Sequence, residues 1–133
     1  GEACRQLYHI TQESKYMDKA KQVINYAATS DRCLRNGILR DEGSSMDQSI
    51  FKSVYIPYAV NLALDEASGS IGKHLITFLK NNAETLRMNL NHAAYPAMYC
   101  NYWWGEMWKS SEPASMGAQV SGASLMEGIA RLE

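Results

Sequence analysis

The chain has 133 residues, of which 46% are hydrophobic and 20% are charged, so it fits one domain with a core and is not disordered, collagen-like or a coiled coil. Its formal net charge is -1 and its 13 lysines and arginines are scattered, which argues against nucleic acid or an anionic membrane surface as a partner. No apolar run approaches the roughly 20 residues of a membrane-spanning helix, so we predict no membrane span.

Two helices are expected at the start of the chain. Apolar residues recur with the 3.6-residue period of a helix from Ala3 to Ile10 and again from Tyr16 to Ala27. We expect the two helices to be joined near Thr11–Ser14.

A third helix is predicted from Ser45 to about Ala67. Ser45 and Gln48 have the spacing of a capping box, in which the two side chains satisfy free backbone donors at the helix start. Apolar residues cover most of the circumference of this helix, so we expect it to be buried nearly all round. Pro57 predicts a kink within it.

Two further helices complete the predicted fold. Ser70 is a candidate N-cap for a fourth helix that continues to about Met88. A fifth helix follows Pro113 and reaches Glu133. Its first part, residues 117–124, is rich in small residues, which suits a helix that packs closely against a neighbouring backbone.

The connections between these helices alternate between short and long. Residues 30–44 and 89–113 form the two long connections. In an up-down arrangement, alternate connections lie at the same end, so both long loops and the start of the first helix should share one face. Long irregular loops are usually functional, so this face is the candidate site. The pattern fits a small bundle, a helical repeat or part of a toroid of helix pairs, and spacing alone does not choose among them.

The second long loop is rich in aromatic residues. It holds all three tryptophans of the chain, at positions 103, 104 and 108, and three tyrosines nearby. Flat rings stack on the apolar faces of sugars and their polar edges bond hydroxyl groups, so this loop is a candidate carbohydrate site. The alternative is that the loop folds down and its rings extend the core. We expect at least one tryptophan in each role.

Three carboxylates lie near the start of the third helix. Asp47 can stabilise the positive end of the helix dipole, or it can contact a ligand's hydroxyl groups together with Lys52. Asp41 and Glu42 are neighbours in the sequence, whereas the catalytic carboxyls of a glycosidase flank one bond at about 5 to 9 Å. We therefore do not expect Asp41 or Glu42 to be catalytic.

Other catalytic and metal patterns are missing from the sequence. Cys4, Cys33 and Cys100 are odd in number and lack the spacing of a zinc site. The three histidines are dispersed, and there is neither a nucleophile motif nor a glycine-rich phosphate loop. We predict no metal and no cofactor.

Three segments carry a family resemblance, namely Asn36–Leu39, Asp47–Tyr55 and Gln119–Ser124. Together they resemble glycoside hydrolase family 76, the bacterial and fungal α-1,6-mannanases. The likeness extends to residues 7–11 and 16–20, so it covers nearly the whole chain in the family's order. Ser53 departs from the pattern, because the family usually has Gly after Phe-Lys.

The resemblance implies a partial (α/α)6 barrel, built from antiparallel helix pairs, with residues 1–133 as a single all-helical domain from its C-terminal portion. The first, third and fifth helices would be inner ones, with their N-termini aimed at the cleft. The family uses a consecutive Asp-Asp pair and a Tyr-Asn-Gln-Gly motif, and this sequence contains neither, so no residue here is expected to be catalytic. The expected substrate-binding residues are Asp47, Phe51, Lys52, Trp103, Trp104 and Gln119.

The leading hypothesis is therefore a C-terminal fragment of a hydrolase that resembles endo-α-1,6-mannanases. It would contribute part of the sugar-binding cleft and be inactive alone. Its expected partners are an α-mannan-like oligosaccharide and either a second copy or the missing N-terminal half, because exposed barrel edges would be apolar. The resemblance favours an extracytoplasmic location. The alternative hypothesis is a free-standing helical module that binds protein through its aromatic loop.

Overall fold

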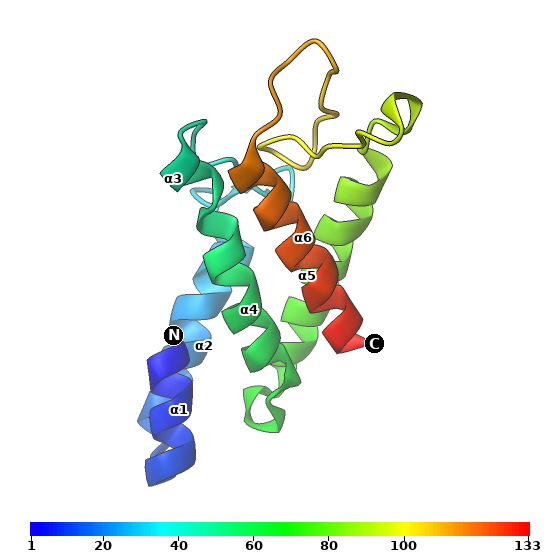
Figure 1. Cartoon of the computed structure of the whole chain (residues 1–133). Coiled ribbons are helices and arrows are strands. Elements are labelled where there is room, and N and C mark those ends of the chain that lie inside the picture. The colour runs from blue at the N-terminus through cyan, green and yellow to red at the C-terminus, as the bar shows by residue number, and fades with distance from the viewer.

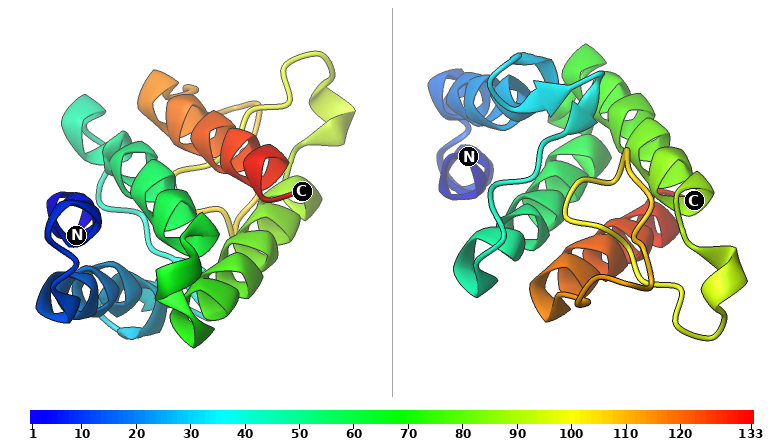
Figure 2. Two further views of the ribbon diagram at one scale, coloured as in Figure 1. Left: turned by 90° about the horizontal axis from the view of Figure 1, so that it is seen from below. Right: turned by 90° about the horizontal axis from the view of Figure 1, so that it is seen from above.

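Five long helices run up and down in the computed structural model, which describes residues 1–133 (Figure 1). Viewed along the helices, α1, α4 and α6 form one layer and α2 and α5 form the other (Figure 2). The predicted all-α fold of antiparallel helix pairs is confirmed. None of these helices is both long enough and apolar enough to cross a bilayer. Their bounds are α1 Glu2–Thr11, α2 Ser14–Thr29, α4 Phe51–Leu64, α5 Ser70–Met88 and α6 Met116–Leu132.

Both long loops lie at one end of the molecule, as predicted, together with the N-termini of α4 and α6 (Figure 1). We call this the loop end. The start of α1 lies part-way down the bundle instead, because α1 has 10 residues and cannot run the length of the 16 residues of α2. The second long loop contains the short 3-10 helix η2, His92–Ala94.

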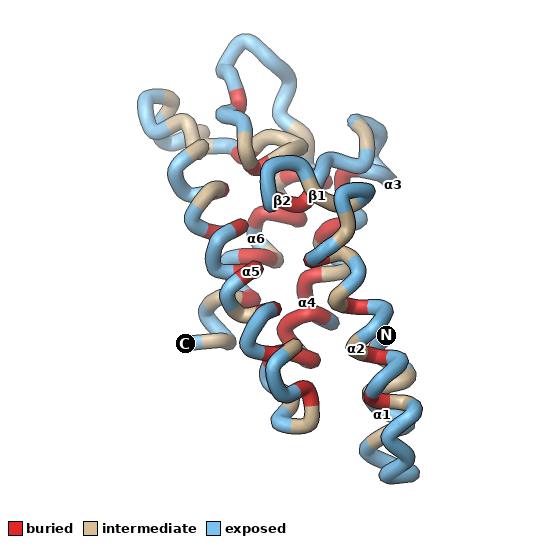
Figure 3. Tube along the Cα trace, turned by 180° about the vertical axis from the view of Figure 1, so that it is seen from behind, coloured by how far each residue is buried: buried red, intermediate tan, exposed pale blue.

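A β-hairpin that the sequence analysis did not predict begins the first long loop. Strands β1 (Leu34–Arg35) and β2 (Ile38–Leu39) pair antiparallel at the loop end (Figure 3). Asn36 and Gly37 join them with positive φ angles of 53° and 76°, which is the chemistry of a two-residue type I′ turn. The fully buried Asn82 of α5 accepts a hydrogen bond from the backbone N–H of Leu39 at 3.0 Å, so the hairpin is fixed to the helices.

The third predicted helix is divided into α3 (Met46–Ser49) and α4, with the break at Ile50. The hydroxyls of Ser49 and Ser53 donate to the carbonyls three residues before them, at 3.0 and 2.6 Å, and such bonds compete with the helix ladder. The break is therefore not at Pro57, through which α4 continues. Half of the predicted capping box is confirmed, because the Ser45 hydroxyl accepts from the backbone N–H of Gln48. The side-chain oxygen of Gln48 accepts from the Ser45 hydroxyl at 2.9 Å instead of from its backbone N–H.

The N-cap of α5 differs from the prediction. Gly69, with a φ of 59°, precedes the helix, and Ser70 is its first residue. The short 3-10 helix η1 (Glu66–Ser68) fills the turn between α4 and α5. A positive φ is adopted by glycine at little cost, so the turn selects Gly69 rather than a hydroxyl side chain.

The core lies between α2, α4 and α5, and α6 packs onto α4 (Figure 3). The small residues of α6 permit this close packing, as predicted. A Cβ atom on Gly117 would lie 2.0 Å from the Ser49 hydroxyl and 3.2 Å from the Met46 carbonyl, and one on Gly128 would lie 2.9 Å from Val60.

One face of α4 remains open, so the prediction of burial all round is wrong. Phe51, Val54 and Tyr58 are 50%, 56% and 43% exposed and follow one another at helical spacing. The opposite face, including Ile56 and Val60, is fully buried. The helix therefore presents an apolar stripe that no other helix of this chain covers.

Helix α1 has no buried residue and is held in part by polar contacts. The nearly buried carboxylate of Asp65 accepts from Arg5 at 2.9 Å and from His9 at 2.5 Å. Burial raises the pKa of Asp65, but the hydrogen bonds from His9 and Arg5 outweigh it and leave this pKa below its ordinary value. The charged carboxylate therefore stabilises the packing of α1 at neutral pH.

Replacing Asp65 by Asn is expected to lower the free energy of unfolding by about 2 kcal/mol, because Arg5 then loses its buried partner. Hydrogen exchange should become faster in α1 and change least in α4. The matched control is Glu84→Gln, which removes an exposed ion pair to Arg87 and should cost less than about 0.5 kcal/mol. Equal losses in the two variants would contradict this role of Asp65.

Candidate functional site

A cavity of about 370 Å³ opens at the loop end between α2, the β-hairpin and α4. We call it the hairpin cavity. The hairpin creates it, because the Asn36-Gly37 turn folds the residues before β1 back beside those after β2. The cavity is lined by Ala27, Arg32, Cys33, Leu39, Arg40, Asp41, Glu42, Lys52 and Tyr55.

The hairpin cavity gathers carboxylates and cationic side chains. Asp41 and Glu42 make no hydrogen bond to another residue, so four carboxylate oxygens are free to accept. Partial burial raises the pKa of Glu42, and the nearby Lys52 ammonium opposes this shift. Burial lowers the pKa of Lys52 to about 8, although Asp41 and Glu42 counteract it. A cavity with free donors and acceptors side by side suits a ligand that carries many hydroxyl groups.

Lys52 lines this cavity and also joins the two long loops. It is 6% exposed, and its Nζ donates to the carbonyl of Arg40 at 3.2 Å and to the carbonyl of Tyr102. The same ammonium lies 4.7 Å from the centre of the Trp104 ring. One side chain therefore links the first loop, the second loop and α4.

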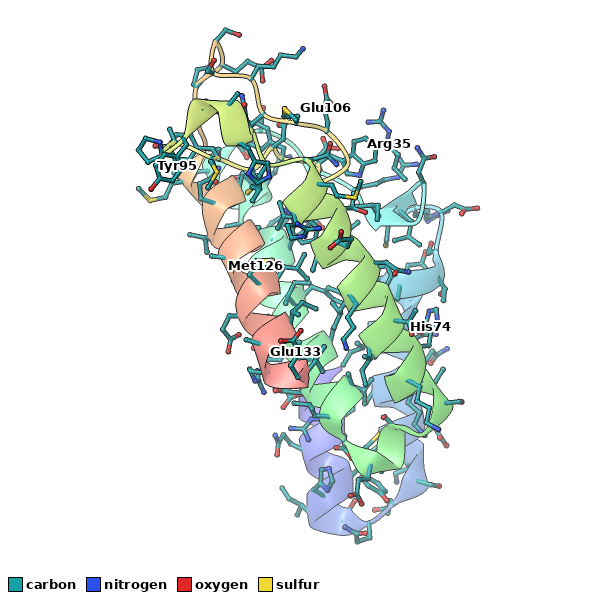
Figure 4. All side chains as sticks on the ribbon, turned by 90° about the vertical axis from the view of Figure 1, so that its right-hand side faces the viewer. Arg35, His74, Tyr95, Glu106, Met126 and Glu133 are labelled. Carbon is teal, nitrogen blue, oxygen red and sulfur yellow. The ribbon has the colours of Figure 1, made fainter.

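The tryptophans pack into the second loop rather than stand open at the surface. Trp104 is fully buried and Trp108 is 7% exposed, which is the core-extending role that the sequence analysis held open. Trp103 is half-buried, and the guanidinium of Arg35 lies 4.0 Å from the centre of its ring. Figure 4 places Arg35 at the loop end with Glu106. Contact of Trp103 with a sugar stays a prediction, and the burial of Trp104 disfavours such contact for that residue.

Gln119 fixes the second loop to α6. Its side-chain oxygen accepts from the backbone N–H of Cys100 at 2.9 Å, and its amide nitrogen donates to the carbonyl of Cys100 at 2.9 Å. The amide nitrogen also donates to the carbonyl of Ser115 at 3.2 Å. The side-chain amide of Gln119 therefore bonds both backbone groups of Cys100, as a residue of a neighbouring strand would. Its predicted contact with substrate stays a prediction.

Asp47 and Phe51 are the predicted site residues with open side chains. Asp47 is exposed at the start of α3 and has no hydrogen-bond partner, and Phe51 is 50% exposed at the start of α4. Asp41 and Glu42 were not expected to be catalytic, and Arg32 was not among the predicted site residues. The signal that could have found this cluster is the Asn-Gly dipeptide, which predicts a hairpin.

The structure matches known glycosidases. It superposes on the α-1,6-mannanase GH76A of Salegentibacter sp. HEL1_6 with a TM-score of 0.87 and 28% sequence identity, over 99% of this chain and 38% of that one. The resemblance to glycoside hydrolase family 76 is confirmed. Over its length the chain has the family 76 fold, and it spans 38% of the enzyme that it matches. No protein-family model and no curated protein matches the sequence.

Two further solved structures match this chain. An inactive variant of the same mannanase, with two consecutive aspartates replaced by alanine, was solved with α-1,6-mannotetrose and has the same TM-score of 0.87. The Lin0763 protein of Listeria innocua matches with a TM-score of 0.80 and 28% identity, over 98% of this chain and 34% of that one. The present chain contains no Asp-Asp pair.

Proposed function

We propose that this chain forms one wall of a cleft that binds α-1,6-linked mannan, as part of a glycoside hydrolase similar to the family 76 endo-α-1,6-mannanases. The observation that carries the proposal is the structural match over 99% of the chain to a mannanase whose inactive variants bind α-1,6-mannotetrose and α-1,6-mannotriose. The hairpin cavity, at the loop end, is the place where this chain would contact the sugar.

The chemistry of the hairpin cavity supports this assignment. Each sugar hydroxyl both donates and accepts a hydrogen bond, so a mannosyl residue needs acceptors and donors in the same place. Asp41 and Glu42 supply acceptors. Arg32 supplies donors, because its guanidinium makes no hydrogen bond within the chain. Asp47 and Phe51 lie exposed at the same end and extend this surface beyond the cavity.

Binding is proposed for this chain, and hydrolysis for the complete enzyme. The mannanase that it matches was inactivated by replacing two consecutive aspartates, and no such pair occurs here. Asp41 and Glu42 are adjacent in the sequence and line the same cavity, so they are not proposed as an acid and nucleophile on opposite sides of a glycosidic bond. We propose, from the family resemblance, that the complete enzyme acts outside the cytoplasm.

The apolar stripe of α4 indicates a protein partner. Beyond Phe51, Val54 and Tyr58 are open along α4, and Leu7 and Ile10 are 40% and 78% exposed on α1 in the same layer. Contiguous apolar surface of this kind marks an interface. We propose that the rest of the barrel, or a second copy of the chain, covers this layer.

The binding proposal is tested by calorimetric titration of the chain with α-1,6-mannotetraose. The double variant Asp41→Asn, Glu42→Gln should weaken binding at least about tenfold, because it replaces two charged acceptors by neutral amides. The control is Glu66→Gln, which changes an exposed carboxylate in η1 at the opposite end of the molecule and should leave the affinity unchanged.

A wild-type chain that shows no heat of binding at millimolar tetraose would contradict the proposed function. Equal affinities of the wild type and the double variant would mean that the chain binds the sugar, but at a place other than the hairpin cavity.

A further inference from the structure

The tip of the β-hairpin is the Asn36-Gly37 dipeptide, and nothing else in the chain packs on it. Both residues are exposed, and a Cβ atom added to Gly37 would meet no atom within 4 Å. Neither the side-chain amide of Asn36 nor the backbone N–H of Gly37 makes a hydrogen bond within the chain. The side-chain carbonyl of Asn36 and the backbone nitrogen that follows it are therefore open to solvent and to each other.

These two groups can react with each other. Hydroxide removes the proton from the backbone nitrogen of Gly37, and this nitrogen attacks Cγ, the side-chain carbonyl carbon of Asn36. The bond between Cγ and the amide nitrogen breaks, ammonia leaves after taking a proton from water, and a succinimide ring remains. Water then adds to either ring carbonyl and opens the ring to aspartate or to isoaspartate. The reaction consumes only water and releases ammonia.

Asn36 differs from the other asparagines of the chain in the residue that follows it. Of the eight asparagines, it is the one that precedes glycine. A side chain on the following residue hinders access to the backbone nitrogen, and glycine has none. Asn25, Asn61, Asn81 and Asn82 also lie within α-helices, where the next backbone N–H already donates to a carbonyl. Position 36 is therefore the most reactive asparagine.

The hairpin is short enough to open while the helices stay folded. The succinimide ring closes only after the backbone of Asn36 rotates away from its φ of 53° in the tight turn. The two strands have two residues each, and a hairpin of this length is unstable by itself. Segments with few packed contacts open locally at a small cost in free energy. The tip can therefore reach the reactive geometry in the native protein.

An isoaspartate at position 36 would change the pairing of the strands. Its backbone runs through the side-chain carboxyl carbon and is longer than that of asparagine by one carbon atom. The two-residue turn then no longer places Arg35 opposite Ile38. Strand β2 must move or separate from β1, because the turn length sets the register of a hairpin.

The hydrogen bonds that β2 and the next residue make carry this change to the hairpin cavity. The backbone N–H of Leu39 donates to the buried Asn82 of α5 at 3.0 Å, and the carbonyl of Arg40 accepts from Lys52 at 3.2 Å. Leu39, Arg40 and Lys52 all line the hairpin cavity. A shift of β2 therefore breaks the contacts that hold one wall of this cavity.

We propose that Asn36 is a site of spontaneous deamidation, and that its isoaspartyl product releases β2 from α5 and opens the hairpin cavity. The modification needs no enzyme, so time, temperature and pH set its extent. The inference is independent of the proposed function, because neither the reaction nor the release of β2 involves a sugar.

The reaction is tested by keeping the folded chain in mildly alkaline buffer and mapping its peptides by mass spectrometry. The Asn36 peptide should gain the mass that accompanies replacement of NH2 by OH at least about tenfold faster than the peptides of the other asparagines. The rate should rise in proportion to the hydroxide concentration. An endoproteinase that cleaves before aspartate but not before isoaspartate separates the two products. The control Asn36→Gly keeps a dipeptide suited to the turn and should show no conversion at this position.

Hydrogen exchange of the purified isoaspartyl fraction tests the release of β2. The backbone N–H of Leu39 should exchange at least about tenfold faster than in the unmodified chain, while exchange in the middle of α5 stays the same. The control Asn36→Asp adds the same charge with an ordinary backbone and should keep the protection of Leu39.

Two results would overturn the inference. If Asn36 stays intact in the folded chain over the time in which it is converted in the urea-unfolded chain, it is not a modification site of the native protein. If the isoaspartyl fraction exchanges Leu39 at the unmodified rate, the modification does not open the hairpin cavity. Sugar binding by freshly prepared, unmodified protein is not affected by either result.

Discussion

Replacing Trp104 by alanine is expected to lower the free energy of unfolding by about 3–5 kcal/mol, which is the usual cost of removing a large buried ring. Trp104 is the largest fully buried side chain of the chain, and the Lys52 ammonium lies 4.7 Å from the centre of its ring. The substitution therefore leaves a cavity beneath both long loops. Urea unfolding followed by circular dichroism measures the loss.

Tyr95→Ala is the matched control for this prediction. Tyr95 lies in the same loop but is 77% exposed, so its loss should cost less than about 0.5 kcal/mol (Figure 4). A cost below about 1 kcal/mol for Trp104→Ala would show that the loop does not pack on the helices as described.

The free energy of unfolding should rise by about 1 kcal/mol between pH 8 and pH 9 because of Lys52. The pKa of this group is 10.5 ordinarily and is lowered to about 8 by burial in the folded chain. In this range the unfolded chain therefore holds more protons than the folded chain, and stability increases with pH. Denaturant unfolding at closely spaced pH values measures the slope.

Two other buried groups limit this rise. Burial raises the pKa of the Cys100 thiol above 9.0 and that of the Tyr55 hydroxyl above 10.0, so the stability that each contributes is lost as the pH climbs past those values. Stability should therefore level off and then fall above about pH 9 to 10. In Lys52→Met the rise between pH 8 and 9 should disappear. A wild-type curve that is flat or falling there contradicts the burial of a charged Lys52.

Local signals were sufficient to predict the helices. The cap at Ser45 depends on residues three positions apart, and the apolar period of α2 lies within one element, so neither needs tertiary information. The hairpin was also predictable, because Asn36-Gly37 is a strong turn signal, but its two-residue strands are too short to show alternation.

The exposure of α4 could not be predicted from its own sequence. Its apolar residues surround the helix, yet the other helices of this chain leave Phe51, Val54 and Tyr58 about half exposed. A pattern along one helix indicates which faces can be buried. It does not indicate which neighbours the rest of the chain supplies.

The structural roles of several candidate site residues also depend on partners that are distant in sequence. Trp104, Lys52 and Gln119 were selected for chemistry that suits a sugar. In the structure Trp104 is buried in the core, Lys52 joins the two long loops and Gln119 ties the second loop to α6. Their partners are distant in sequence, such as Cys100 for Gln119, and only the folded chain brings them together. The free carboxylates Asp41 and Glu42 became candidates because the hairpin turns them toward α4.

Binding of α-1,6-linked mannose at the loop end can be followed residue by residue through backbone amide shifts in ¹⁵N-labelled protein. Saturating α-1,6-mannotetraose should shift the signals of residues 39–42, 100–102 and Lys52 and leave those of η1 and the C-terminal end of α1 unchanged. An α-1,4-linked glucotetraose should produce no such pattern. Shifts spread evenly over the chain, or the absence of shifts at the loop end, would contradict sugar binding at the loop end.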